Sequence, residues 1–261
     1  MSELPLGWRT DLEVLQRSGA VLERHSDHIV VRSPDNPGFH WGNFVMVTSP
    51  ELAVDAPACI DLFRTRFPRA GHVAIGLPEP VAEAWKRSDL HYEWDTVLVA
   101  SSPPVLPQSP AGYSVRRLTT EDDWARCLAA DVAEHVRTGG SAGADYTDFV
   151  RGRMRTRAHL TRQETGAFFG AFAGDELVAD LGIVLCDAHT ARYQSVATAY
   201  AHRGRGLASH LLSVAGWWAQ GSGATRWVIV AEPASPAERL YRGLGMVPTA
   251  VSSQVYWPGA M

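Results

Sequence analysis

The sequence predicts an α/β fold in which a mixed central sheet is flanked by helices. Three observations support this prediction. A strand-like run at residues 191–198 passes through a glycine-containing loop into a helical pattern at residues 207–220. A proline-rich segment, residues 101–113, divides the chain. On both sides of that segment, short extended runs alternate with amphipathic ones, which is the element order of α/β domains.

Length and composition fit two folded domains. The chain has 261 residues, of which 46% are hydrophobic and 20% are charged. These values are typical of folded domains, and the length allows one large or two small ones. We place the division in the proline-rich segment. This gives an N-terminal domain at residues 1–105 and a C-terminal domain at residues 111–261.

Charge and cysteine content exclude several classes of protein. The formal net charge is −4 and the isoelectric point is about 6.2, so no broad surface for nucleic acid or an anionic membrane is expected. The three cysteines are widely spaced and form neither a disulfide framework nor a metal-binding pattern. The N-terminus lacks the layout of a signal peptide, and no apolar run approaches the roughly 20 residues that cross a bilayer. We therefore expect a cytoplasmic location.

The first hundred residues alternate helical and extended patterns. In order, we expect a helix at residues 11–24, paired strands within HIVVRS and GNFVMVTS, a helix at 56–67, a strand within AGHVAIGL, a helix at 81–87 and a strand at 93–100. This half contains no glycine loop comparable with the one that follows residue 198.

The second half begins with an extended run at residues 114–118. Thr119 or Thr120 is suited to cap the following helix, which we expect to end near Val136. The remaining expected elements are a helix at 146–163, a hairpin that turns at Gly174 and Asp175, strand 191–198, helix 207–220, strand 227–231, a short helix and a final strand.

Capping signals define the short helix near the C-terminus. Ser235 is a good N-cap, Pro236 is a good first helical residue, and Glu238 occupies the capping-box position. Gly245 is a C-terminal stop signal. The helix therefore follows the strand at residues 227–231 after a short connection.

The loop between residues 198 and 207 is suited to bind an anion. Gly204 and Gly206 lie where a strand passes into a helix N-terminus, and such a position offers several unpaired backbone N–H groups. Glycines carry no Cβ atom to obstruct a close approach, and the helix dipole adds partial positive charge. The expected ligand is a pyrophosphate.

Two familiar phosphate-binding loops do not fit this segment. No Lys-Ser or Lys-Thr follows the glycines, as a Walker loop requires, and the third position of a dinucleotide fingerprint is His210. What remains is the pattern R-x-x-G-x-A, formed by Arg203, Gly206 and Ala208. A glycine-rich strand-to-helix loop without any ligand is the structural alternative.

Together with the preceding VATAYAH, this pattern resembles the acyl-CoA-binding motif of the GNAT superfamily of N-acyltransferases. The later segment SPAERLYRGLGM resembles the last helix of that family, and the resemblance extends over about residues 111–261. The N-terminal half is similar to a shortened, degenerate GNAT domain. Its segment NPGFHWGNFV resembles part of some two-domain actinobacterial GNAT-like proteins. Without a glycine loop, we expect it to bind no CoA and to have a structural or substrate-shaping role.

The resemblance implies acetyl-CoA as co-substrate and no metal. Its pantetheine amides would pair with backbone of the strand, and its pyrophosphate would lie on the loop and the first helical turn. The cofactor-binding residues implied are Val196, Ala197, Thr198, Arg203, Gly204, Arg205, Gly206, Leu207, Ala208, Ser209 and Tyr241. The side chains of the two arginines would bind phosphate, or one of them would be exposed to solvent. The sequence departs from the family at Ala199 and Tyr200, where HP or a similar pair is common.

The resemblance also places catalytic groups. Tyr241 matches the tyrosine that in many GNAT enzymes points at the thioester sulfur, and its phenol can donate a proton to the leaving thiolate. A core aromatic is the structural alternative. Glu232 is the first candidate for the general base, because it follows the strand at which the sheet is expected to splay. The other candidates for this role are Asp180, the adjacent residues Glu134 and His135 at the end of the first helix of this half, and a water molecule.

We therefore expect an acyl-CoA-dependent N-acyltransferase that moves an acetyl group from acetyl-CoA to a primary amine of a small molecule or an amino terminus by direct attack. A non-catalytic acyl-CoA sensor or scaffold is the alternative, and an unrelated nucleotide-binding module is a third. The expected partner is the amine acceptor, without nucleic acid or membrane. The oligomeric state stays open, with a homodimer as one option.

Overall fold

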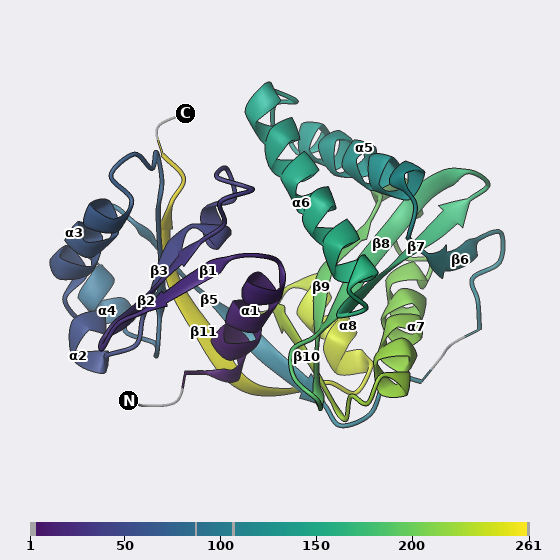
Figure 1. The fold of residues 1–261 in the computed structure, drawn as a ribbon. Coiled ribbons are helices and arrows are strands. Elements are labelled where there is room, and N and C mark those ends of the chain that lie inside the picture. The colour runs from purple at the N-terminus through teal and green to yellow at the C-terminus, as the bar shows by residue number, and fades with distance from the viewer. Residues whose placement is uncertain (1–3, 87, 106–107, 260–261) are drawn as a thin grey trace. The chain divides into compact units, whose positions relative to one another are not determined.

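The structure is a computed structural model that describes residues 4–86, 88–105 and 108–259 (Figure 1). The chain forms two compact units. The first comprises residues 1–98, 230–239 and 248–261, and the second comprises residues 99–229 and 240–247. Each unit is an α/β arrangement with its own strands and helices, so the predicted fold class, a mixed sheet flanked by helices, is confirmed.

The first unit orders its strands β1-β2-β3-β4-β11-β5. Its helices are α1 (Leu6–Arg17), α2 (Pro50–Ala53), α3 (Ala56–Arg66) and α4 (Ala82–Trp85). Its strands are β1 (Val21–Arg24), β2 (His28–Arg32), β3 (Phe44–Val47), β4 (Val73–Leu77), and most of β5 (His91–Ala100) and β11 (Val247–Trp257). β1, β2 and β3 are antiparallel neighbours, whereas β3 and β4 run parallel.

The last strand of the chain completes the sheet of this first unit. β11 runs antiparallel to β4, with Val255 opposite Ile75. The same strand is also bonded to α1, because the indole N–H of Trp8 donates to the carbonyl oxygen of Ser253 at 3.3 Å. The predicted domains, residues 1–105 and 111–261, remain a prediction. The compact units differ from them because residues 230–239 and 248–259 group with the N-terminal half.

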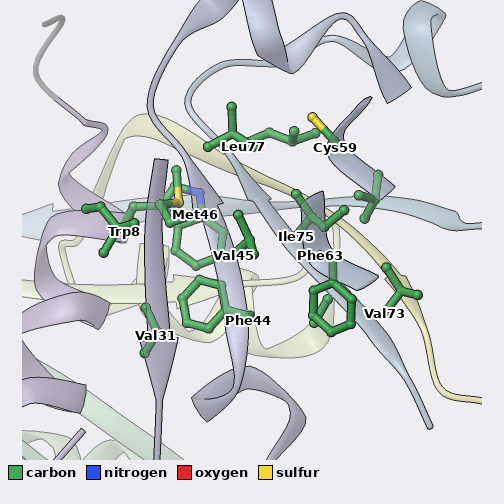
Figure 2. Packing of buried hydrophobic residues seen from close by; sticks show 14 of the residues in the cluster. Trp8, Val31, Phe44, Val45, Met46, Cys59, Phe63, Val73, Ile75 and Leu77 are labelled. Carbon is green, nitrogen blue, oxygen red and sulfur yellow. The ribbon is translucent and has the colours of Figure 1, made fainter. Parts of the chain in front are cut away.

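The core of the first unit lies between its sheet and its helices. Phe44, Met46 and Ile75 are fully buried strand residues, and Phe63 reaches the same core from α3 (Figure 2). Trp8 of α1 packs against Phe44 with the ring centroids 5.6 Å apart. Nonpolar side chains from all of these elements share one interior, and their removal from water stabilises the unit.

The predicted helix at residues 11–24 is wrong in both of its bounds. α1 begins at Leu6 and ends at Arg17, and residues 21–24 form β1 instead. Gly19 takes a positive φ of 93°, and the N–H of Ala20 donates to the carbonyl of Leu15 at 2.9 Å, which is how helices commonly end. The chain then pairs with β2. The predicted helix at 81–87 is reduced to α4, and Arg87 lies outside the described residues.

The second unit orders its strands β10-β9-β8-β7-β6. Its elements are β6 (Ser114–Arg117), α5 (Glu121–Arg137), α6 (Ala144–Arg162), β7 (Gly166–Ala173), β8 (Glu176–Leu185), β9 (Thr190–Thr198), α7 (Leu207–Gly221), most of β10 (Arg226–Ala231) and the C-terminal half of α8 (Pro236–Gly243). The strands from β6 to β9 are antiparallel, and β10 runs parallel to β9. The element order predicted for this half is confirmed.

Helices cover both faces of this second sheet. α5 and α6 pack on one face and α7 packs on the other (Figure 1). On the α7 face, the hydroxyl of Tyr193 donates to the carbonyl of Leu212 at 2.9 Å. Thr120 caps α5 as predicted, because its side chain accepts from the N–H of Asp123 at 3.2 Å and the Asp123 carboxylate accepts from Thr120 in return.

A stacked histidine pair links three parts of the first unit. The rings of His40 and His72 are parallel with centroids 4.0 Å apart, and Nδ1 of His40 is hydrogen-bonded to the Tyr256 hydroxyl at 2.6 Å. His72 is bonded through Nε2 to the Asn43 carbonyl at 3.0 Å. Burial lowers the pKa of both imidazoles, and the neighbouring charge of His72 lowers that of His40 further.

We expect the stability of the chain to fall as the pH is lowered below about 6.5, the ordinary pKa of histidine. The unfolded chain then binds protons that the folded pair resists, and each such proton changes stability by at most about 1.4 kcal/mol per pH unit. Urea unfolding of the wild type and of His72→Gln at pH 7.5 and 5.5 measures this. The variant should lose less stability on acidification. An equal loss in both proteins would show that the pair does not contribute.

Candidate active site

The edge of β9 that faces β10 becomes free part of the way along the strand. β10 pairs with β9 only from Arg226 to Val228, opposite residues 190–192. Both strands continue beyond this point, but among the described residues their ladder extends no further. The second half of β9 therefore has backbone groups that a ligand can pair with, in the manner of an added strand.

A β-bulge turns the same part of β9. Gly182 of β8 lies opposite Gln194, whereas Asp180 lies opposite Ala197, so the two strands shift register between these pairs. Ser195 at the bulge takes a positive φ of 52°, which is uncommon for a residue with a side chain. Residues 195 and 197 are exposed, whereas residues 190–193 at the start of β9 are buried. The bulge thus changes the direction of the strand where the predicted site residues Val196, Ala197 and Thr198 begin.

The predicted phosphate loop has the backbone geometry of an anion site. After a short 3-10 helix, Tyr200–His202, Gly204 and Gly206 take φ values of 73° and 78°, and Gly206 is the N-cap of α7. A Cβ at either glycine would meet no atom of the protein, so the backbone conformation, rather than lack of space, requires glycine.

In the described structure, the N–H groups of the loop and of the first turn of α7 take no part in the hydrogen bonds of the helix. The first helical bond runs from the N–H of His210 to the carbonyl of Gly206 at 3.0 Å. Within the described part of the chain, no protein acceptor is recorded for the N–H groups of residues 204–209. Loop residues 203–206 are exposed. Unpaired N–H groups at a helix N-terminus form a site for phosphate or carboxylate.

The two arginines of the loop are held by the protein. Arg203 donates through Nε to the carbonyl of Thr198 at 3.1 Å and through Nη2 to Glu134 of α5 at 2.7 Å. Arg205 donates through Nη1 to the hydroxyl of Tyr113 at 3.0 Å and through Nη2 to the carbonyl of Ala201 at 3.3 Å. Both side chains therefore turn back toward the protein.

Tyr241, the predicted proton donor, lies on α8 and is only 5% exposed. Burial raises the pKa of its phenol to about 12, although the nearby charge of Arg192 acts in the opposite direction. A phenol with this pKa keeps its proton at neutral pH, so its O–H can donate a hydrogen bond to a developing anion. Ser235 caps α8 as predicted, because its hydroxyl accepts from the N–H of Glu238 at 3.1 Å, and the Glu238 carboxylate accepts from the N–H of Ala234 at 2.6 Å.

The candidate general bases differ strongly in their surroundings. Glu232 follows β10 and is exposed, and it belongs to the first compact unit. Glu134 accepts hydrogen bonds from Arg137 at 2.6 and 2.7 Å, and these contacts, together with Arg203, hold the pKa of its carboxyl below the usual range. His135 is stacked on Tyr146, with the ring centroids 3.6 Å apart. A carboxylate with a lowered pKa is a weak base, so Glu134 is poorly suited to take a proton.

Asp180 is buried in an ion pair. Its carboxylate lies 2.7 Å from Nη1 of Arg157, and the two side chains are 6% and 4% exposed. Burial raises the pKa of Asp180, and the charge of Arg157 opposes this rise. The side chain points to the α6 face of the sheet, away from solvent. It is therefore a structural anchor between β8 and α6 rather than a group that reaches an incoming amine.

Sequence reasoning missed two residues that organise this site. Tyr113 stands at the end of the proline-rich segment, and the pattern of residues 101–113 indicated only a linker. Glu134 was considered as a base, but its contact with Arg203, which lies 69 residues further along the chain, was not predicted. No local pattern reports such contacts, because they depend on how the helices pack on the sheet.

The comparisons with known proteins are consistent with this geometry. Residues 140–246 match the acetyltransferase (GNAT) family. The C-terminal part of the chain contains a GNAT acetyltransferase domain. The fold as a whole resembles a GCN5-related N-acetyltransferase from Kribbella flavida, with a TM-score of 0.68, 14% identity, and coverage of 99% of this chain and 98% of that one.

Two further structures share the fold. A GCN5-related N-acetyltransferase from Sphaerobacter thermophilus has a TM-score of 0.61 and 17% identity, over 92% of this chain and 84% of the other. A tandem GNAT protein from the clavulanic acid biosynthesis pathway, solved without acetyl-CoA, has a TM-score of 0.57 and 16% identity, over 97% and 88%. No curated protein sequence matches the chain. At these identities, the likeness shows the fold alone.

The GNAT domain supports acyl-CoA-dependent acetyl transfer in general, with acetyl-CoA as co-substrate and an amine-containing acceptor. Among the described residues, no group of three or more histidine, cysteine or acidic side chains could hold a metal ion. None of the helices described is long and apolar enough to cross a membrane.

We expect Asp180→Ala to lower the free energy of unfolding by about 3–5 kcal/mol, because it leaves the Arg157 charge buried without its partner. The double variant Asp180→Leu with Arg157→Met removes both charges and should recover most of this loss. Urea unfolding of the three proteins measures both effects. A double variant as unstable as the single one would contradict the ion-pair explanation.

Proposed function

We propose that the chain is an N-acetyltransferase that moves an acetyl group from acetyl-CoA to a primary amine of a small molecule or an amino terminus. The unpaired N–H groups at residues 204–209 carry this proposal, together with the free edge of β9 beside them. A pyrophosphate would accept from the loop and the first turn of α7. Backbone of Val196, Ala197 and Thr198 would pair with the amides of the pantetheine arm.

The reaction needs few groups from the protein. The amine nitrogen attacks the thioester carbonyl, a C–N bond forms, and the C–S bond breaks. Tyr241 would act on the departing sulfur through its hydroxyl, which donates a hydrogen bond or its proton as thiolate charge develops. Burial raises the pKa of this phenol to about 12, which keeps it protonated at neutral pH and favours the hydrogen bond over complete proton transfer. The proton released by the amine would go to Glu232 or to water. Glu232 is exposed and so is accessible to a water molecule that relays the proton.

A second candidate function is an acyl-CoA-binding sensor or scaffold without turnover. The observation that favours it is the state of the other carboxylates, because Glu134 is held by two arginines and Asp180 is buried in an ion pair. Release of CoA thiol from acetyl-CoA in the presence of a panel of primary amines separates the two functions. Amine-dependent thiol release supports the enzyme, whereas tight binding of acetyl-CoA with no release for any amine supports the sensor.

We expect Gly206→Asp to abolish the binding of CoA, measured by calorimetry. The change introduces a side chain where φ is 78° and a negative charge beside the proposed pyrophosphate. The wild type should bind one CoA per chain, because no comparable glycine loop precedes residue 101. Gly174→Asp is the matched control, since Gly174 has a φ of 60° in the β7–β8 turn. Unchanged affinity in a folded Gly206→Asp protein, or a second site within residues 1–100, would contradict the assignment.

We expect Tyr241→Phe to lower kcat and kcat/KM together by about 10- to 1,000-fold, with little change in the affinity for acetyl-CoA. The hydroxyl is proposed to act as thiolate charge develops, and such a group contributes mainly in the transition state. A thioester with a better leaving group should recover part of the loss. Steady-state kinetics with an accepted amine test this, and turnover at the wild-type rate would make Tyr241 a packing residue.

A further inference from the structure

Tyr113 connects the start of the second unit to the proposed cofactor loop. It directly precedes β6, and its hydroxyl accepts from Nη1 of Arg205 at 3.0 Å and lies 2.9 Å from Nδ1 of His202. Because Arg205 supplies the proton for the first bond, the hydroxyl proton is left to donate to His202. The Tyr113 and His202 rings meet edge to face, with centroids 5.8 Å apart and an interplanar angle of 83°.

The two residues that Tyr113 contacts lie on either side of Gly204. These two contacts are important because the backbone of the loop makes few other hydrogen bonds to the protein. Gly204 and Gly206 both have positive φ values, and residues 204–209 show no backbone N–H bonds to the protein within the described chain. A loop with glycines and unpaired amides loses conformational entropy when it closes on a ligand. A contact that orders the loop beforehand reduces that loss on binding.

The arginines of the loop are placed as anchors. Arg205 donates to the hydroxyl of Tyr113 and to the carbonyl of Ala201, two residues that precede Gly206 in the chain. Arg203 makes its bonds to Thr198 and to Glu134, and its guanidinium lies 5.5 Å from the centre of the Tyr200 ring. Each guanidinium thus donates to two polar groups of the protein. Ties of this kind fix where the loop backbone points.

We propose that Tyr113 is a positioning residue for the cofactor loop. Its hydroxyl holds Arg205 in place, and this contact orders the loop whose backbone N–H groups bind the phosphates. This inference rests on the proposed function, because it assumes that CoA binds at residues 204–209. It assigns a role in cofactor binding to a residue outside the loop, 92 positions away from Arg205.

Tyr113→Phe tests the proposal without changing any charge. The variant keeps the ring against His202 and removes only the hydroxyl. Loss of the two hydrogen bonds made by this hydroxyl should raise the Kd for CoA about threefold to tenfold, measured by calorimetry. In steady-state kinetics, KM for acetyl-CoA should rise by the same factor with kcat unchanged. Tyr92→Phe is the matched control, because no hydrogen-bond partner of the Tyr92 hydroxyl is found in the described structure.

A double-mutant cycle with Arg205→Lys shows whether the two residues act together. Lysine keeps the positive charge but cannot span both the Tyr113 hydroxyl and the Ala201 carbonyl as guanidinium does. We expect Arg205→Lys to weaken binding by about the same factor as Tyr113→Phe, and the double variant to bind no more weakly than either single variant. Equal thermal unfolding midpoints for all four proteins show that the losses arise in the loop and not in the fold.

The possible outcomes are distinct. Wild-type affinity in Tyr113→Phe, or losses that multiply in the double variant, would overturn the inference and leave the proposed function intact. An Arg205→Lys protein that binds CoA as the wild type does while Tyr113→Phe binds weakly would also overturn it. A wild-type protein that binds no CoA would overturn the proposed function, and the inference with it.

Discussion

The candidate site depends on one constraint, which is that backbone N–H and C=O groups need hydrogen-bond partners. Almost every such group in a folded interior is paired, and an unpaired set at one place marks either solvent or a ligand. Here β9 loses its β10 neighbour after Arg192, and the N–H groups of residues 204–209 have no recorded acceptor in the described chain. The two sets follow each other along one segment. One ligand with amides and a pyrophosphate can satisfy both.

In the same segment, a strand, a loop and a helix together place the backbone groups of the candidate site. The bulge at Ser195 turns the strand, and the two glycines turn the chain again before α7 begins. The side chains around them supply rigidity. Arg203 is tied to α5 through Glu134, and Arg205 is tied to Tyr113. The site is therefore built from backbone groups whose positions are fixed by side chains that come from distant parts of the chain.

The acidic residues considered as general bases divide into structural and accessible groups. Asp180 and Arg157 neutralise each other in the interior, and Glu134 is shared between two arginines. Each of these carboxylates has a defined electrostatic partner, and the direction of its pKa shift follows from burial or from that partner. Glu232 is exposed. These differences explain why a list of acidic residues near a motif does not identify a base.

Local sequence patterns were enough to predict the α/β class, the order of elements from β6 to β11 and the position of the loop. These features depend on local signals, such as the Thr120 cap, the Gly174 turn and the glycines before α7, whose effects extend over only a few residues. Tertiary structure alone decided that β11 pairs with β4, that Asp180 meets Arg157, and that Tyr113 reaches Arg205. Residues 11–24 illustrate the boundary between the two. Their helical spacing was real as far as Arg17, but pairing with β2 made residues 21–24 a strand, because hydrogen bonds to a neighbouring strand outweigh a weak local preference.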